Sequence, residues 1–323
     1  MTNHISQKER IQQIFFQYAY QKAEEIKKQK GLFVYYTSAE TATSIIEKRQ
    51  IWMRNTMTMN DYREVEHGFD CLNKAYKGEP GIKFNAVLNS CFHGLAEEVS
   101  SLFNSWLPTI RFDSYITCLS EHLPSENMHG RLSMWRAYGN QTGVALVLNG
   151  DVIFSESDVL KAYTSPVLYI NQEGFSEAFM NIAERMKEET EFIVSLGREL
   201  VKNVVFNMFR FAVLCTKHPG FHEEREWRVV ANPKMLNSEY LIPALEVVRG
   251  IPQTVFKIDL VNHEDEGLTG LDLPELLNRI IIGPCQYPAV LFNAFARLLE
   301  NAEIKDGWKK ITVSDIPLRH ING

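Results

Sequence analysis

Three acids, two arginines and a tryptophan stand together in one short stretch, His222–Val230 (HEEREWRVV). The stretch ends in β-branched residues, which favours a strand. Alternate side chains of a strand share a face, so Glu224, Glu226 and Arg228 would point the same way. The two carboxylates would then lie about 7 Å apart at their Cα atoms, close enough to act on one substrate. An edge strand whose acids pair with neighbouring arginines fits the pattern equally well.

Two further segments mix polar and aromatic side chains. Asn60-Asp61-Tyr62-Arg63-Glu64 is a polar turn that could line a site, although such turns more often only cap or connect elements. Ser133–Tyr138 predicts a helical turn that brings Trp135 and Tyr138 to one face. These two rings could stack on a ligand or seal the hydrophobic core.

The composition indicates a globular protein, but the overall charge does not identify what it binds. The 323 residues are 45% hydrophobic and 23% charged, and the net charge of −6 argues against a surface built as a whole for nucleic acid. The five cysteines stand singly without a C-x-x-C pair, which favours a reducing compartment over disulfides or structural zinc. Because we find neither a secretory signal nor a membrane-spanning stretch, we expect a cytoplasmic protein.

The periodicity predicts helices and strands that intermingle without strict alternation, which is typical of an α+β fold. The expected helices are Gln7–Lys30, a long helical region at about 175–211, and Tyr287–Ala302. The expected strands are Leu32–Thr37, Ile51–Met53, Tyr115–Ser120, Val144–Leu148, Pro166–Ile170, Thr254–Leu260, Asn278–Gly283 and Trp308–Val313. We expect an N-terminal helical extension over residues 1–30 and a single domain over residues 31–323.

Four separated pieces resemble a bacterial family known only as domain-of-unknown-function family 2971. These pieces are Leu32–Ser38, Asn60–Glu64, Met134–Tyr138 with Gly143, and Glu224–Arg228. In addition, Ile280–Gly283 is similar to the closing strand of that family. The resemblance runs in order from about residue 31 to residue 285, but it supplies no chemistry.

The opening strand, with the helix and short strand that follow it, also resembles the start of the ADP-ribosyltransferase superfamily. That resemblance implies a central split sheet of mixed or antiparallel strands, flanked by helices, and NAD as the substrate. It implies that Tyr35 stands where the superfamily has His or Arg, with Tyr36 and Thr37 beside it. The middle strand would contribute Ser120 or Thr117.

The same resemblance assigns roles to the other candidate residues. Glu226 would stabilise the oxocarbenium-like state that forms when NAD loses nicotinamide, and Glu224 would activate or position the acceptor. The resemblance also implies which other residues bind the cofactor, by ring stacking, by contact with the pyrophosphate or by other polar contacts. They are Trp135, Tyr138, Arg228, Asn60 and Asp61.

The leading hypothesis is therefore an NAD-dependent ADP-ribosyltransferase that modifies a protein or nucleic acid, as a bacterial toxin or antiviral defence effector. An antitoxin or other regulatory protein would be its partner, and no membrane is involved. Plain NAD hydrolysis needs the same glutamate and no acceptor. One alternative is a metal-dependent, nuclease-like enzyme that uses Asp61, Glu64, Glu224 and Glu226. Another is a non-catalytic module that binds a nucleotide or a partner.

Overall fold

The computed structural model describes residues 5–59, 64–139 and 141–317, without the side chain of Glu64. The chain folds into two compact units, each assembled from separate stretches of sequence. Unit 1 comprises Met1–Glu24, Asn55–Ser114 and Ser165–His222, and unit 2 comprises Glu25–Arg54, Tyr115–Thr164 and Glu223–Gly323. The mixture of helices and strands confirms the predicted α+β class. The predicted division into residues 1–30 and 31–323 stays a prediction.

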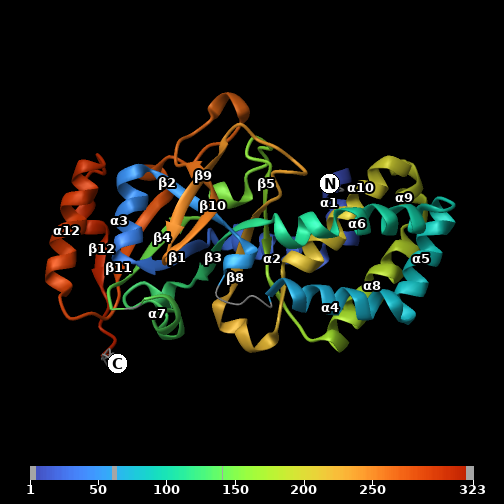
Figure 1. Cartoon of the computed structure of the whole chain (residues 1–323), viewed down its shortest axis with the longest axis horizontal. Helices are drawn as coiled ribbons and strands as arrows, with labels where there is room; N and C mark the ends of the chain where they lie inside the picture. Colours follow the sequence, from blue (N-terminus) through green and yellow to red (C-terminus); the bar gives the residue numbers. More distant parts are fainter. Residues whose placement is uncertain (1–4, 60–63, 140, 318–323) are drawn as a thin grey trace. The chain divides into compact units, whose positions relative to one another are not determined.

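Unit 1 is mainly helical (Figure 1). Its helices are α1 (Gln7–Phe15), α4 (Glu64–Lys77), α5 (Glu79–Cys91), α6 (Leu95–Phe112), α8 (Gln172–Glu188), α9 (Thr190–Leu196) and α10 (Arg198–Leu214). Two short strands, β6 (Leu168–Tyr169) and β7 (Thr216–Lys217), pair in parallel. Its core is aromatic, because the Phe209 ring contacts the rings of Phe84, Phe103 and Phe179. Burial of such rings stabilises this unit.

A glycine on α4 allows two helices of unit 1 to approach closely. A Cβ atom on Gly68 would lie 2.1 Å from the carbonyl oxygen of Val213 on α10. No larger residue fits without moving the backbone, so the sequence must supply glycine here.

One helical prediction is corrected, and another is confirmed and divided into separate helices. The predicted helix Gln7–Lys30 is broken into α1 and α2 (Gln17–Gln29), because the backbone at Phe16 leaves the helical region, with φ −130° and ψ 34°. The long helical region at about 175–211 consists of α8, α9 and α10. Gly197, with φ 82°, ends α9 and begins α10, a conformation that favours glycine.

Unit 2 is built on one mixed sheet flanked by helices, as predicted. The strand order is β12-β11-β4-β1-β3-β2-β10-β9; β8 pairs with β3, and β5 pairs with β8. β11 and β12 are parallel, whereas the other pairs with a described register are antiparallel. The strands are β1 (Leu32–Ser38), β2 (Gln50–Asn55), β3 (Tyr115–His122), β4 (Gly143–Asn149), β5 (Ala162–Pro166), β8 (Glu226–Ala231), β9 (Leu241–Val248), β10 (Ile251–Asp259), β11 (Leu277–Ile282) and β12 (Ile311–Val313). The helices are α3 (Ala39–Lys48), α7 (Leu132–Tyr138), α11 (Leu273–Leu276) and α12 (Pro288–Asn301).

The sheet forks at β3. Strand β1 pairs with β3 only over Leu32–Val34, whereas its pairing with β4 continues to Ser38. β3 is also a neighbour of β2 and pairs along Tyr115–Ser120 with β8. β1 therefore leaves β3 after Val34, and the start of β1 and the start of β8 lie on either side of the C-terminal end of β3 at Ser120.

Candidate functional site

The strand register brings three of the predicted site residues to one face of the sheet. Ser120 is the partner of Val34 on β1 and of Glu226 on β8. Partnered residues project to the same side, and Tyr36 shares that side because it lies two residues after Val34. Tyr36, Ser120 and Glu226 therefore share one face, which we call the fork face.

Glu226 forms a buried ion pair on this face. The Nε atom of Arg228 lies 2.8 Å from Oε1 of Glu226, and its Nη2 atom lies 3.3 Å from Oε2. The side chains of Arg228 and Glu226 are 0% and 7% exposed. Such a two-point contact fixes the orientation of the carboxylate. The sequence had left open whether Arg228 pairs with Glu226 or binds phosphate, and the structure contains the pair.

Tyr35 and Thr37 point to the opposite face of the sheet. On β4 their partners are Leu146 and Val144, whereas Tyr36 is the partner of Ala145. Side chains alternate along a strand, so Tyr35 lies on the other side of β1 from Val34, the partner of Ser120. Burial, followed by the charge of Cys118 on β3, raises the pKa of Tyr35. The predicted part of Tyr35 in the site of Glu226 stays a prediction, and Tyr36 is the residue at the end of β1 that shares the side of Val34.

Glu224 does not lie on the strand that carries Glu226. Strand β8 begins at Glu226, and Glu224 ends the 3₁₀ turn Pro219–Glu224. Between them Arg225 adopts φ 44°, in the left-handed region that ends a regular strand. The predicted alternation of two carboxylates on one strand face is therefore wrong.

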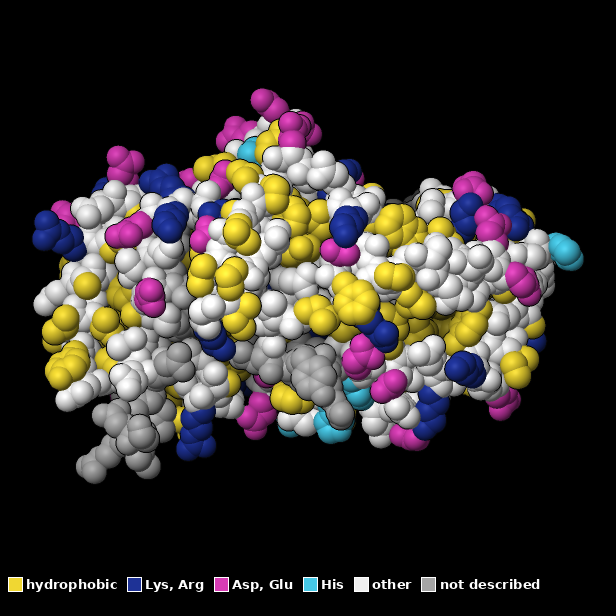
Figure 2. Space-filling model, viewed as in Figure 1, with side chains coloured by type: hydrophobic (Ala, Val, Ile, Leu, Met, Phe, Trp, Pro, Cys, Tyr) yellow, Lys and Arg dark blue, Asp and Glu magenta, His cyan; other side chains and the backbone are white. Residues whose placement is uncertain are grey.

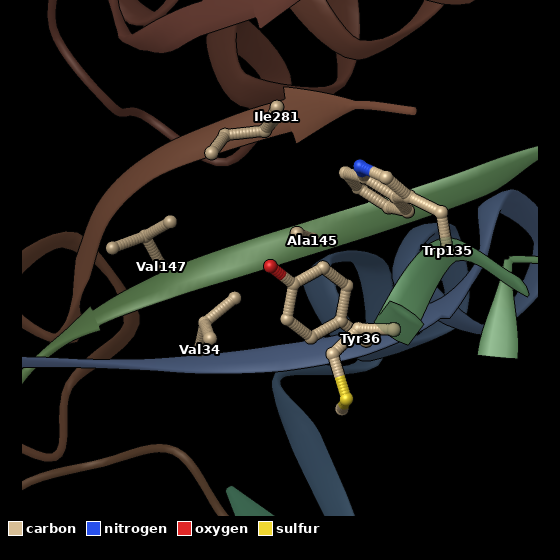
Figure 3. Packing of buried hydrophobic residues seen from close by; sticks show 7 residues of the cluster. Val34, Tyr36, Trp135, Ala145, Val147 and Ile281 are labelled. Carbon is tan, nitrogen blue, oxygen red and sulfur yellow. The ribbon is translucent and has the colours of Figure 1, made fainter. Parts of the chain in front are cut away.

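Trp135 and Tyr138 come from α7, which covers the fork face beside β1. The Trp135 indole is 1% exposed and meets the Tyr36 ring edge to face, with centroids 4.9 Å apart. Figure 3 shows these two rings with Val34 and Ala145 in the hydrophobic cluster, against which Tyr138 also packs. In this structure Trp135 is thus a core residue, enclosed by protein.

The Tyr36 hydroxyl has a structural partner. It accepts a hydrogen bond of 2.9 Å from the backbone N–H of Arg131. Burial raises the pKa of Tyr36 to about 12, so the phenol stays neutral at physiological pH. Tyr36 can therefore offer a hydrogen bond or a ring face, but no charge.

Asn60 and Asp61 lie outside the described residues, as does the side chain of Glu64. Their predicted part in cofactor or metal binding stays a prediction. Among residues 5–59, 64–139 and 141–317, no group of three or more His, Cys, Asp or Glu side chains is arranged to hold a metal ion.

Sequence reasoning missed Arg131, which ties the turn before β8 to β3. Its Nε donates to Oε1 of Glu126 at 2.9 Å, and its Nη2 donates to the Glu121 carbonyl at 2.7 Å. Its Nη1 donates to the carbonyls of Glu223 and Glu224, at 2.6 and 3.1 Å. Arg131 thus fixes the turn that immediately precedes Glu226. Its partners are five to 93 residues away, so no local pattern could reveal this role.

Glu126 is the anionic centre of this arrangement, 9% exposed like Arg131. Burial alone would raise the pKa of Glu126, but hydrogen bonds from Arg131 and the Leu123 backbone, with the charge of Arg225, hold it below its usual value. An Nη2 atom of Arg225 lies 3.3 Å from Oε1 of Glu126. Because its folded-state pKa is lowered, Glu126 stabilises the fold above about pH 4.5, and this contribution is lost on acidification.

His122 lies beside this cluster, and we expect it to make stability depend on pH. Burial lowers its pKa, and the hydrogen bond with Asn127 and the charge of Glu126 offset only part of this effect. Below about pH 6.5 the unfolded chain gains a proton that the folded chain resists, so the free energy of unfolding falls. Against His122→Gln, the wild-type profile from urea unfolding should fall more steeply between about pH 6.5 and 5, by up to about 1.4 kcal/mol per pH unit. Parallel profiles would contradict this account.

These features define an α+β protein whose mixed sheet forks beside a buried glutamate–arginine pair. Residues 134–229 match the family described as "Protein of unknown function (DUF2971)", which supports the predicted resemblance to that family over this segment. The match includes α7 from Met134 onwards and the Glu226–Arg228 pair, but neither β1 nor β3. No curated protein and no solved structure matches the chain. Among the described residues, every helix is too short or too polar to span a bilayer.

Proposed function

We propose that this chain is an enzyme of the ADP-ribosyltransferase type, which cleaves NAD and transfers ADP-ribose to a macromolecule. One observation carries the proposal: Glu226 is held by Arg228 on the same face as Ser120 and Tyr36, beside the fork of the sheet. An acid on a late strand and a hydroxyl on a middle strand are two of the elements that the resemblance implies. On the first strand Tyr36 lies on this face, whereas the resemblance implies a His or Arg at the position of Tyr35.

The chemistry follows from the position of one carboxylate. Cleavage of the bond between nicotinamide and ribose leaves positive charge on the ribose, and a fixed anion nearby stabilises that charge. Glu226 supplies the anion, and Arg228 orients it so that little reorganisation is needed during the reaction. The Ser120 hydroxyl, on the same face as Glu226, would hydrogen-bond the ribose. The bonding electrons leave with nicotinamide, and an acceptor or water then adds to the ribose carbon.

The biological setting is part of the proposal. The resemblance supports a cytoplasmic toxin or antiviral defence effector that acts on a protein or nucleic acid and is controlled by an antitoxin or other regulatory partner. Because Glu224 lies in a turn before the strand, we assign it no role in transfer. The acceptor would then be a group that is nucleophilic without activation by Glu224.

A double-label experiment tests this proposal. The purified full-length chain is incubated with NAD labelled in the nicotinamide ring and, separately, in the adenosine moiety, with and without bacterial lysate. We expect release of labelled nicotinamide, together with adenosine label on macromolecules when lysate is present. Nicotinamide release without macromolecular label would identify NAD hydrolysis. No release under either condition would refute both forms of the proposal.

A further inference from the structure

Unit 1 contains a cavity lined by its own residues, whereas Tyr36, Ser120 and Glu226 belong to unit 2. Its volume is about 230 Å³, and α4, α6 and α10 surround it. Figure 2 shows hydrophobic side chains gathered over the helices of this unit. Most of the wall is apolar and aromatic, formed by Phe69, Leu72, Tyr76, Phe103, Leu107 and Phe209. An apolar cavity of about 150 Å³ is enough to hold benzene, so this one has room for a substituted aromatic ring.

The cavity wall also contains a buried hydrogen-bond donor without a partner. Arg111 lines the cavity, and its Nε atom is buried and makes no hydrogen bond with any described residue. Leaving such a buried donor unsatisfied is unfavourable, so a ligand that supplies an acceptor gains by pairing with it.

The charge of Arg111 is already balanced. Its Nη2 atom lies 3.0 Å from Oε2 of Glu66, and its guanidinium lies over the Phe69 ring at 4.7 Å from the centroid. Because Glu66 neutralises the guanidinium, an anionic ligand would meet a carboxylate as well as a cation. The wall therefore favours a neutral acceptor, such as a carbonyl oxygen, over a carboxylate.

Helix α6 adds a complementary acceptor. Pro108 lies inside the helix and has no N–H, so the helical hydrogen bond to the Asn104 carbonyl cannot form. Asn104 and Pro108 both line the cavity, as does Asn73. The Asn104 carbonyl thus lacks its usual helical donor, and a ligand with an N–H group can donate to it.

We propose that this cavity binds a neutral aromatic carboxamide: the ring fills the space between the phenylalanines, and the amide carbonyl accepts a hydrogen bond from Nε of Arg111. The amide N–H groups face the acceptors of α6 and α4. All lining residues belong to unit 1, whereas Glu226 belongs to unit 2, so binding here does not require NAD cleavage.

Calorimetric titration of the full-length chain with benzamide tests the proposal, with benzoate as the charged analogue of the same shape. We expect benzamide to bind with a Kd on the order of 1 mM or tighter, and benzoate at least about fivefold more weakly. Arg111→Met keeps the apolar stem but removes the donor, and should weaken benzamide binding about tenfold. Arg297→Met, at an exposed arginine of α12, should leave it unchanged.

A second variant keeps the test decisive if Arg111→Met folds poorly. Ser100→Phe places a ring in the cavity from α6 and should abolish benzamide binding while the melting temperature stays within a few degrees. No heat of binding with the wild-type chain at millimolar benzamide would overturn the proposal. Equal binding of benzamide and benzoate, or binding unaffected by Arg111→Met and Ser100→Phe, would overturn it as well.

Discussion

Replacing Arg131 with methionine lowers the free energy of unfolding by about 3–5 kcal/mol. Removing one partner of a buried ion pair leaves the other charge uncompensated, and here that charge is Glu126, 9% exposed on its side chain. The substitution also deprives the carbonyls of Glu121, Glu223 and Glu224 of their donor. Because Arg131 ties β3 to the turn before β8, the loss should appear in global unfolding, measured by urea denaturation.

Two controls separate this effect from a general loss of charge. Arg131→Lys keeps the positive charge but not the several N–H donors of the guanidinium. We therefore expect an intermediate loss in the free energy of unfolding. Lys83 pairs with Glu184 on the surface, with side chains 38% and 51% exposed. Lys83→Met should therefore change the free energy of unfolding by less than about 1 kcal/mol. Similar losses for Arg131→Met and Lys83→Met would show that the buried Arg131–Glu126 pair contributes no more to the free energy of unfolding than an exposed ion pair does.

Replacing Glu226 with glutamine should reduce nicotinamide release by at least about 100-fold. Glutamine has nearly the same shape as glutamate but lacks the negative charge that the proposed transition state requires. The amide can still meet Arg228, although the buried guanidinium then lacks a counter-ion. We therefore expect Glu226→Gln also to lower stability by several kcal/mol.

The loss of activity must be separated from that loss of stability. Rates are compared at a temperature where circular dichroism shows both chains folded. Glu226→Asp provides a second test, since it keeps the charge but withdraws the carboxylate by one methylene. We expect it to keep Arg228 partly paired and to be more stable than Glu226→Gln, yet to release nicotinamide far more slowly than the wild type. Full activity of Glu226→Asp would argue against a precisely positioned anion.

Much of the fold of unit 2 could be predicted because its signals are local. The apolar run at Val144–Leu148 and the Ile280–Ile282 run indicate buried strands, and both are found in β4 and β11. Ser38 caps α3 by accepting a hydrogen bond from the Thr41 backbone, a local interaction of a kind that sequence patterns can indicate. Such patterns depend on neighbours in sequence, so no tertiary information is needed.

The face on which each site residue lies could not be predicted, since it depends on long-range pairing. Alternation alone says that Tyr35 and Tyr36 face opposite ways, but only the pairing of Val34 with Ser120 shows which one accompanies Glu226. The left-handed backbone of Arg225, which removes Glu224 from the strand, is also set by tertiary contacts, because arginine has no intrinsic preference for it.

The most direct test of the central claim is nicotinamide release by the wild type, Glu226→Gln and Glu223→Gln, measured side by side at equal folded concentration. Glu223 is an exposed glutamate three residues before Glu226 and serves as the matched control. If the fork-face carboxylate cleaves NAD, the wild type and Glu223→Gln should release nicotinamide at similar rates, and Glu226→Gln should be slower by at least about 100-fold. Equal rates for Glu226→Gln and the wild type would contradict the claim.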